Sequence, residues 1–422
     1  MVGPGSFRLP ASRREVARNL GFDLAAAIGV GATLAMVTAL LPTIARRGGL
    51  DPIGLAALAA APFIANLLGA FAGRWGPRTP AQLAGLRIAG AAGLLLLFVV
   101  PTPPAMVLVA MVFWLGLSFG NPFQLRLWGT MYPARMVGRL VGVIGMTRAA
   151  ATALAAFGGG LLAERVGGPE AVAVVGLVGV VSALAYAGLR ARTSEPPRPY
   201  SARDSIRVLQ ERPVLRRVTL AQGFYGAGLV AATPLFALVH VDRLDLSLAQ
   251  VGVIGILIAI STTVTFPLWG VAADRAGSLV VLRAGSAIGL VGLAAYAVAP
   301  DVRVLWLAAI ATGIANAAID LGFTAVLSEH ASIASRPAAS AGLNAITGAR
   351  GIAAAFLMSA LLELGIVDVT FGLVLCVVTS ALGVALFMRI RPSVPIETGV
   401  WRIDPSTTAS PAIIGVVASE PG

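Results

Sequence analysis

The chain has 422 residues, of which 57% are hydrophobic and 12% are charged, and its mean hydropathy is +0.88. A soluble domain carries about a quarter charged residues, so this chain cannot cover a soluble globular surface with polar groups. The net charge is +12 and all 31 basic residues are arginine, but these arginines lie in short segments between apolar runs, which is typical of membrane proteins rather than of nucleic-acid-binding domains.

A membrane-spanning helix needs about 20 mostly apolar residues, and this criterion predicts twelve of them. The first follows a basic N-terminal segment, but it is too long for a signal peptide and no Ala-x-Ala cleavage site follows it. We therefore predict an all-α integral membrane protein with spans near 18–42, 52–73, 80–100, 105–127, 139–163, 169–190, 217–240, 248–272, 279–299, 302–327, 338–363 and 367–389.

The placement of the arginines predicts the orientation of these spans. If the N-terminus is cytoplasmic, the outward segments hold only Arg46, Arg47, Arg165, Arg243 and Arg303. Most of the others, including Arg74, Arg78 and Arg87, belong to inward segments, so the positive-inside rule places both termini in the cytoplasm. The absence of lysine is typical of a GC-rich genome, and we expect a multi-pass protein of the bacterial inner membrane.

A polar segment divides the spans into two sets of six. The predicted domains are an N-terminal six-helix bundle (1–192), a cytoplasmic linker (193–216), a C-terminal six-helix bundle (217–390) and a disordered cytoplasmic tail (391–422). Within the linker, Ile206, Val208 and Leu209 indicate either a short amphipathic helix on the inner leaflet or a solvated connection.

The two halves repeat one another. Gly69, Arg74 and Gly76 recur 201 residues later as Gly270, Arg275 and Gly277. Because each half has an even number of spans, the halves run parallel through the membrane, as in one large class of secondary transporters.

The sequences "GAFAGRWGPR" (69–78) and "GVAADRAG" (270–277) resemble the signature Gly-x-Leu-Ala-Asp-Arg-x-Gly-Arg-Arg of the major facilitator superfamily. The resemblance implies the fold of that family. It also implies a gating motif that keeps the cytoplasmic side of the transporter closed while the outer side is open. In this sequence the motif consists of Gly69, Arg74, Gly76, Arg78, Gly270, Asp274, Arg275 and Gly277. Gly73 replaces the acid of the first copy, so we expect the second copy to carry the gating contact, and we expect Gly73→Asp to be tolerated or to slow opening.

The resemblance also implies that the first, fourth, seventh and tenth spans line a central cavity. Polar side chains inside spans are costly and are typical of functional positions. The cavity candidates are Asp23, Asn121, Gln124, Gln222, Asn316 and Asp320. Asp320 is a candidate partner for Arg350, and Asp23 is a candidate partner for Arg148. Each pair either holds helices together permanently, or its carboxylate exchanges a proton while its arginine changes partner.

Only Asp23 and Asp320 could carry a proton near the cavity, because both histidines lie at the ends of spans and arginine keeps its proton. We predict a secondary transporter of a small organic molecule, first as proton-coupled export and alternatively as uptake or exchange of a nutrient or organic anion. The proline of a glycine-rich signature found in many drug antiporters is missing from the fifth span, which weakens assignment to them. A non-transporting, receptor-like member is a third possibility.

From the sequence, we expect that the protein is not an enzyme and that it binds no cofactor and no metal. It lacks lysine, and with it the phosphate-binding Gly-x-x-x-x-Gly-Lys-Ser/Thr motif of ATPases, and its two histidines and one cysteine do not form a metal-binding set. The expected partners are a small-molecule substrate and the lipid bilayer, with no nucleic acid and a monomeric state.

Overall fold

The computed structural model describes residues 12–71, 77–190, 202–331 and 335–391, and these residues form helices without strands. Twelve helices in them are long and apolar enough to cross a membrane, which confirms the predicted number of spans. The N-terminal half consists of α1 (Arg13–Ala35), η1 (Met36–Leu40), α2 (Leu41–Arg47), α3 (Pro52–Phe71), α4 (Pro80–Gly93), η3 (Leu94–Phe98), α5 (Pro103–Met131), α6 (Ala134–Val166), α7 (Gly168–Ala183) and η4 (Leu184–Gly188).

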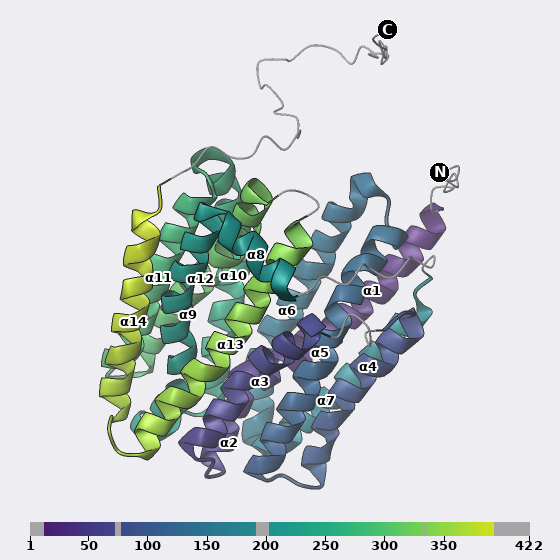
Figure 1. The fold of residues 1–422 in the computed structure, drawn as a ribbon. Coiled ribbons are helices and arrows are strands. Elements are labelled where there is room, and N and C mark those ends of the chain that lie inside the picture. The colour runs from purple at the N-terminus through teal and green to yellow at the C-terminus, as the bar shows by residue number, and fades with distance from the viewer. Residues whose placement is uncertain (1–11, 72–76, 191–201, 332–334, 392–422) are drawn as a thin grey trace.

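The C-terminal half has the same order of spans. It consists of α9 (Pro213–Leu238), η5 (Val239–Arg243), α10 (Leu248–Ala276), α11 (Ser278–Val298), α12 (Val302–His330), α13 (Arg336–Glu363) and α14 (Val369–Arg389). A short helix, α8 (Ala202–Glu211), precedes it. The two halves stand side by side, and α3 and α13 pack together at their boundary (Figure 1).

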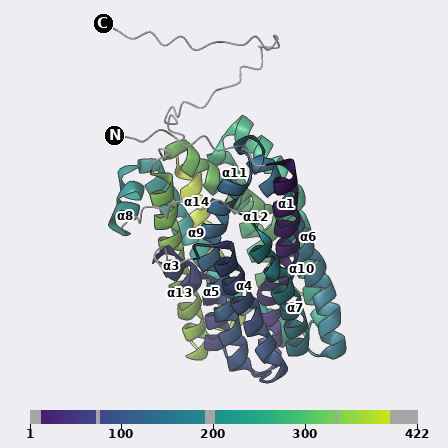
Figure 2. The same ribbon diagram turned by 90° about the vertical axis from the view of Figure 1, so that its right-hand side faces the viewer.

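Both faces of the bundle can be defined from the chain. We call the end where α1 begins and α14 ends the terminal face, and the end that carries residues 48–51 and 244–247 the opposite face (Figures 1 and 2). The predicted tail 391–422 falls outside the described residues except for Arg391, so its order is not addressed by the structure.

Glycines bring the two halves into close contact. A Cβ atom at Gly160 in α6 would lie 2.5 Å from the carbonyl oxygen of Leu248, and one at Gly252 in α10 would lie 2.6 Å from that of Ala156. Small residues allow helices in a bilayer to approach this closely. The α6–α10 contact is therefore fixed by residues without bulky side chains.

The first spans of both halves contain a π-helical turn. η1 interrupts the first span and ends two residues before Pro42, and η5 ends the seventh span, beginning five residues after Pro234. Such turns occur where proline or packing disturbs the regular hydrogen-bond ladder, and they are frequent at functional sites. Both turns take part in the contact between the halves, because η1 packs against α10 and η5 packs against α2.

The amphipathic segment of the linker is helical, as one of the two readings predicted. Ser205 and Leu209 are buried, whereas Arg207 and Gln210 are exposed. α8 packs on α13 and α9, and a Cβ atom at Gly342 would lie 2.7 Å from the carbonyl oxygen of Ser205. α8 is thereby attached to the C-terminal half.

Candidate functional site

Asp23 lies inside the N-terminal half with its carboxylate held by two donors. The Tyr132 hydroxyl donates to Oδ2 at 2.5 Å and the Trp128 indole donates to the same atom at 3.2 Å. Burial and the neighbouring Asp23 carboxylate raise the pKa of Tyr132, so its hydroxyl stays protonated and remains a donor. Asp23 is 1% exposed and its Oδ1 has no hydrogen-bond partner among the described residues.

The depth of Asp23 differs from the prediction. The first span begins at Arg13, not near residue 18, so Asp23 lies ten residues, about 15 Å, from the start of the helix. The expected pair between Asp23 and Arg148 does not form in the structure, because the carboxylate faces α5 and not α6.

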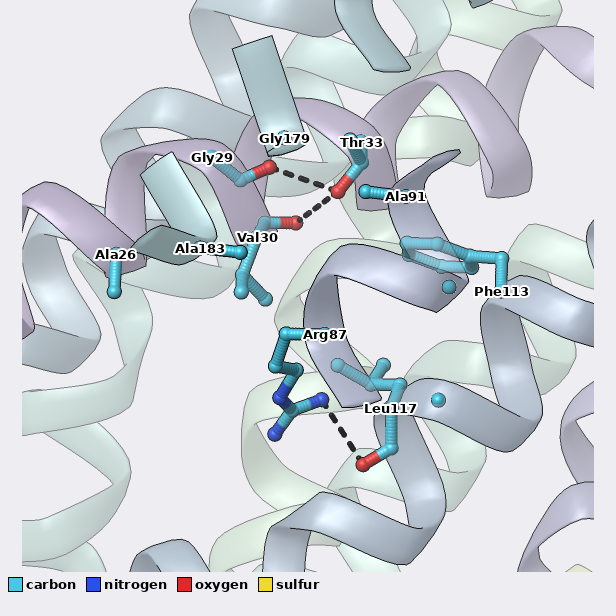
Figure 3. Close-up of a pocket in the computed structure, with 12 residues that line it drawn as sticks. Ala26, Gly29, Val30, Thr33, Arg87, Ala91, Phe113, Leu117, Gly179 and Ala183 are labelled. Carbon is cyan, nitrogen blue, oxygen red and sulfur yellow. Dashed lines mark hydrogen bonds between the residues drawn. The ribbon is translucent and has the colours of Figure 1, made fainter. Parts of the chain in front are cut away.

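Arg87 is a buried cation at the centre of a second network, and the prediction that it belongs to an inward-facing polar segment is wrong. It lies in α4 and is 6% exposed. Its Nη1 donates to the carbonyl oxygen of Leu117 at 3.0 Å, as Figure 3 shows, and its Nη2 donates to Asn121 Oδ1 at 2.8 Å and Gln124 Oε1 at 2.9 Å.

The Arg87 network fixes two of the predicted cavity residues. The Gln124 amide donates in turn to the Tyr186 hydroxyl at 3.1 Å, and the Arg87 guanidinium lies 6.0 Å from the centre of the Tyr186 ring. Asn121 is exposed and its amide nitrogen makes no hydrogen bond with the described residues. A small cavity between α1, α4, α5 and α7 reaches this network, with Gly29, Thr33 and Phe113 in its wall (Figure 3).

Arg148 and Asp320 lie in the middle of spans of different halves, α6 and α12. Both residues are exposed in the structure, and the pair does not form a salt bridge. Asn316 is exposed too and lies four residues from Asp320, so the two side chains share a face of α12, as predicted. Charged groups in the middle of spans face the protein interior or a water-filled cavity.

Arg350 occupies a different position from the one expected. Its Nη1 donates to the backbone oxygen of Gln222 in α9, and the guanidinium lies against Gly226. The predicted pair of Arg350 with Asp320 is therefore absent, because the side chain is turned toward α9. The side-chain oxygen of Gln222 is buried without a partner among the described residues.

Hydrogen bonds between the two halves gather at the opposite face. Arg46 Nη2 lies 2.8 Å from Asp242 Oδ2, and its Nε donates to both carboxylate oxygens at 3.0 and 3.1 Å. Arg47 donates to the carbonyl oxygen of Leu246, and Glu164 accepts a 3.0 Å hydrogen bond from the backbone N–H of Ala249.

A buried histidine lies beside these polar contacts. His240 Nδ1 is 3.2 Å from the Thr43 hydroxyl of the other half, and its Nε2 is 3.3 Å from the Tyr296 hydroxyl. The side chain is 6% exposed. The halves are thus joined at this face both by a partly exposed ion pair and by a buried, hydrogen-bonded histidine.

The structure describes only part of the gating motif. Arg74 and Gly76 fall outside the described residues, whereas Gly69, Arg78 and the whole second copy lie within them. Asp274 and Arg275 are exposed, and neither forms an ion pair with a described residue. Gly277 has φ = 90°, which favours glycine, and it separates α10 from α11.

Two matches to the family model named Major Facilitator Superfamily, at residues 24–245 and 218–419, together cover nearly the whole chain. The chain belongs to the major facilitator superfamily. The protein is accordingly a membrane transporter and not an enzyme. Within the part of the chain that the structure describes, no group of three potential metal-binding side chains is found.

Solved transporters share the fold of this superfamily member at low sequence identity. A nucleoside transporter, NupG, is 15% identical with a TM-score of 0.67, and the match covers 88% of this chain and 98% of that one. An auto-inhibited POT family peptide transporter is 10% identical (TM-score 0.69; 89% and 98% covered). A bacterial homologue of the human lysosomal transporter Spinster, in an inward-facing and occupied conformation, is 16% identical (TM-score 0.64; 90% and 97% covered). No curated protein matches the sequence.

Sequence reasoning missed several polar residues of this transporter. Arg87 lies within the predicted span 80–100, and its position seven residues after Pro80 could have identified it as an intramembrane cation. Tryptophan is common at membrane interfaces, so the sequence does not single out Trp128, whose indole N–H donates to Asp23. No local signal identifies Tyr132, because its partner lies 109 residues away in the sequence.

Proposed function

We propose that this protein is a proton-coupled secondary transporter that moves a small organic molecule by rocker-switch alternating access. The observation that carries the proposal is the clustering of hydrogen bonds between the halves at the opposite face, from Arg46–Asp242 to Glu164–Ala249. A bundle joined by polar contacts at one face is closed there, and alternating access requires these contacts to break when the halves rock.

The arrangement of arginines supports one orientation of this cycle. If the terminal face is cytoplasmic, as the positive-inside rule predicts, the closed face is the outer one and the structure is an inward-facing form. The exposed, unpaired state of Asp274 agrees with this assignment, because the gating motif acts in the outward-open form. We place the protein in the bacterial inner membrane as a monomer.

Proton coupling is supported by the two aspartates in the middle of the spans. Asp23 is buried, accepts two hydrogen bonds and forms no salt bridge with a described residue, so it is a candidate for taking up and releasing a proton. Asp320 is exposed and lies in the middle of α12. The proton gradient is then the energy source, and no cofactor is needed.

The two versions of this function differ in the charge of the cargo. Export of a drug or metabolite in exchange for entering protons is the first expectation from the sequence. Uptake or exchange of an organic anion is favoured by one specific observation, the exposed guanidinium of Arg148 without a salt bridge in the described structure.

The test is transport by the purified protein in proteoliposomes with an imposed pH gradient. The compounds are a cationic set (ethidium and tetraphenylphosphonium) and an anionic set (benzoate, succinate and glycerol phosphate). We expect the flux of one set to follow the gradient and Asp23→Asn to abolish that dependence, whereas the control Asp245→Asn, at an exposed loop position, retains it. If the flux is the same with and without the pH gradient in both wild type and Asp23→Asn, proton coupling is rejected.

A further inference from the structure

His240 is buried at the contact between the two halves, on the opposite face. Its side chain is 6% exposed, and Thr43, its partner from the other half, is 1% exposed. Nδ1 lies 3.2 Å from the Thr43 hydroxyl, and Nε2 lies 3.3 Å from the Tyr296 hydroxyl. Both ring nitrogens therefore face hydroxyl groups, and the contact with Thr43 exists only while the halves are closed at this face.

The backbone around His240 connects the ring to the other contacts between the halves. The N–H of Leu246 donates to the His240 carbonyl oxygen at 2.7 Å, and Arg47 of the other half donates to the carbonyl oxygen of the same Leu246. His240 belongs to the π-helical turn η5, and Thr43 lies three residues after the π-helical turn η1. A change at the imidazole therefore acts within the set of contacts that must break when this face opens.

The charged groups around His240 are predominantly positive. Its own turn, η5, carries Asp242 and Arg243, and α2, which packs against η5, carries Arg46 and Arg47. Asp242, the single acid of these two elements, is already bonded to Arg46. His240 itself forms no salt bridge with a described residue. A proton on the imidazole would thus add a fourth positive charge to three arginines and one aspartate.

The remaining elements beside His240 bring no carboxylate to this contact. α11 supplies the Tyr296 hydroxyl, and α9 packs directly against η5. The charged residues of these two helices lie near the terminal face: Arg216, Arg217 and Arg283. In the adjoining loop Asp245 is exposed, so solvent screens its charge. The surroundings of the buried ring therefore do not compensate a positive charge on it.

We propose that His240 is a pH-sensitive latch of the opposite face: the neutral imidazole holds the halves together, and protonation of the ring favours the open form. A neutral ring fits between two hydroxyls, because one nitrogen donates and the other accepts. Burial of the ring as a cation without a carboxylate is costly. When the face opens, water reaches the ring and removes that cost. The inference rests on the proposed rocking of the halves, but on neither the cargo nor a proton-coupled flux.

Linkage between protonation and opening gives the sign and the size of the effect. A group that binds its proton only in the open form favours that form as the pH falls. An imidazole in water takes up its proton near pH 6.5, so its protonated-to-neutral ratio is about 0.1 at pH 7.5 and about 10 at pH 5.5. Because the closed form keeps the ring neutral, the open-to-closed ratio rises by up to about tenfold between these two pH values. Acid on the side of the opposite face therefore opens it.

Distances between spin labels at this face test the proposal. The labelled variant carries Thr102→Cys and Pro300→Cys in a Cys376→Ala background, because Thr102 and Pro300 are exposed residues of different halves at the opposite face. Double electron–electron resonance on the full-length protein, purified without a transported compound, measures the open and closed fractions at pH 7.5 and pH 5.5. We expect the open-to-closed ratio to rise at pH 5.5, by up to about tenfold.

Three further substitutions in the labelled protein assign the pH response to one residue. His240→Gln has an amide that donates and accepts hydrogen bonds but takes up no proton, so it should lose the response. His240→Asn is a second variant that does not titrate, and it should lose the response as well. His330→Gln is the matched control, because His330 is the only other histidine and is buried at the terminal face. It should retain the response of the wild type.

The outcomes distinguish this inference from the proposed function. An open-to-closed ratio that does not rise at pH 5.5, or a rise of the same size in His240→Gln and His240→Asn, overturns the latch. Asp242→Asn weakens closure without removing the imidazole. If this variant opens but shows no pH response, the rocking of the halves stands and only the role of His240 is overturned. If no variant has an open population at either pH, both the rocking of the halves and the latch are rejected.

Discussion

Arg46 and Asp242 connect the two halves of the bundle by a bidentate contact, with Arg46 Nη2 2.8 Å from Asp242 Oδ2 and Nε bonded to both carboxylate oxygens. Their side chains are 26% and 41% exposed, so solvent screens the pair and its contribution is about 0–1 kcal/mol. Because 1.4 kcal/mol is a tenfold change in an equilibrium, breaking the pair shifts the closed population by roughly fivefold at most.

We predict that Asp242→Asn increases opening of this face by about two- to fivefold. The measurement is maleimide labelling of a cysteine at position 39, in a Cys376→Ala background, because Ala39 packs against Gly255 between the halves. Asp245→Asn serves as the control, since Asp245 is exposed near the same loop and forms no salt bridge in the described structure. Equal labelling rates in wild type and Asp242→Asn would show that this pair does not contribute to closure.

The hydrogen bond from Tyr132 to Asp23 predicts a coupled effect on stability. Hydrogen bonds to charged groups contribute about 1.5–3 kcal/mol, and removal of one partner leaves a buried acceptor less well satisfied. Tyr132→Phe should therefore lower the free energy of unfolding by about that amount. In an Asp23→Asn background the same substitution should cost about 1 kcal/mol or less, because the acceptor is no longer charged. Additive losses in the double mutant would contradict a direct interaction.

Asp274 is expected to affect transport without affecting the stability of the form described here. Its side chain is exposed and forms no ion pair with the described residues, so Asp274→Asn should change the melting temperature by less than about 1 °C. If the carboxylate acts in the gating motif when the terminal face is closed, as the family resemblance implies, the transport rate should fall at least threefold. The control is Arg275→Lys, which keeps the charge next to it. A normal rate for Asp274→Asn would reduce the motif to a topological role.

The span architecture was predictable because it depends on composition. A bilayer requires about 20 apolar residues per helix, and the twelve predicted runs correspond to twelve helices. The shared face of Asn316 and Asp320 was predictable for the same kind of reason, since residues four apart lie on one side of a helix.

The polar partners were not predictable, because they depend on how each helix is rotated against its neighbours. Asp23 was expected to meet Arg148, but it accepts hydrogen bonds from Trp128 of α5 and from Tyr132, which directly follows α5. Arg350 was expected to meet Asp320, but its guanidinium is turned to the backbone of Gln222. Hydropathy contains no information about such rotations, and one sequence offers no co-variation from which to infer them.

Arg87 provides the strongest test of the polar network inside the N-terminal half. Its guanidinium satisfies three acceptors, on Leu117, Asn121 and Gln124, and it has no carboxylate to pair with in the described structure. Arg87→Ala leaves these oxygens without their donor and opens space beside the cavity between α1, α4, α5 and α7. We expect the free energy of unfolding to fall on the order of 3 kcal/mol.

Arg87→Lys is the matched control for charge. A lysine keeps the positive charge but has a single donor group, so it cannot reproduce the planar arrangement that reaches both side-chain oxygens and the backbone. The expected loss is intermediate between wild type and Arg87→Ala, measured by thermal unfolding in detergent. If Arg87→Lys is as stable as wild type, the stabilising effect of Arg87 is due to its charge alone. If Arg87→Ala is as stable as wild type, the hydrogen-bond network does not stabilise the fold. Because Asn121 is held by this network, the Ala variant should also weaken transport even where the folded fraction is restored by lowering the temperature.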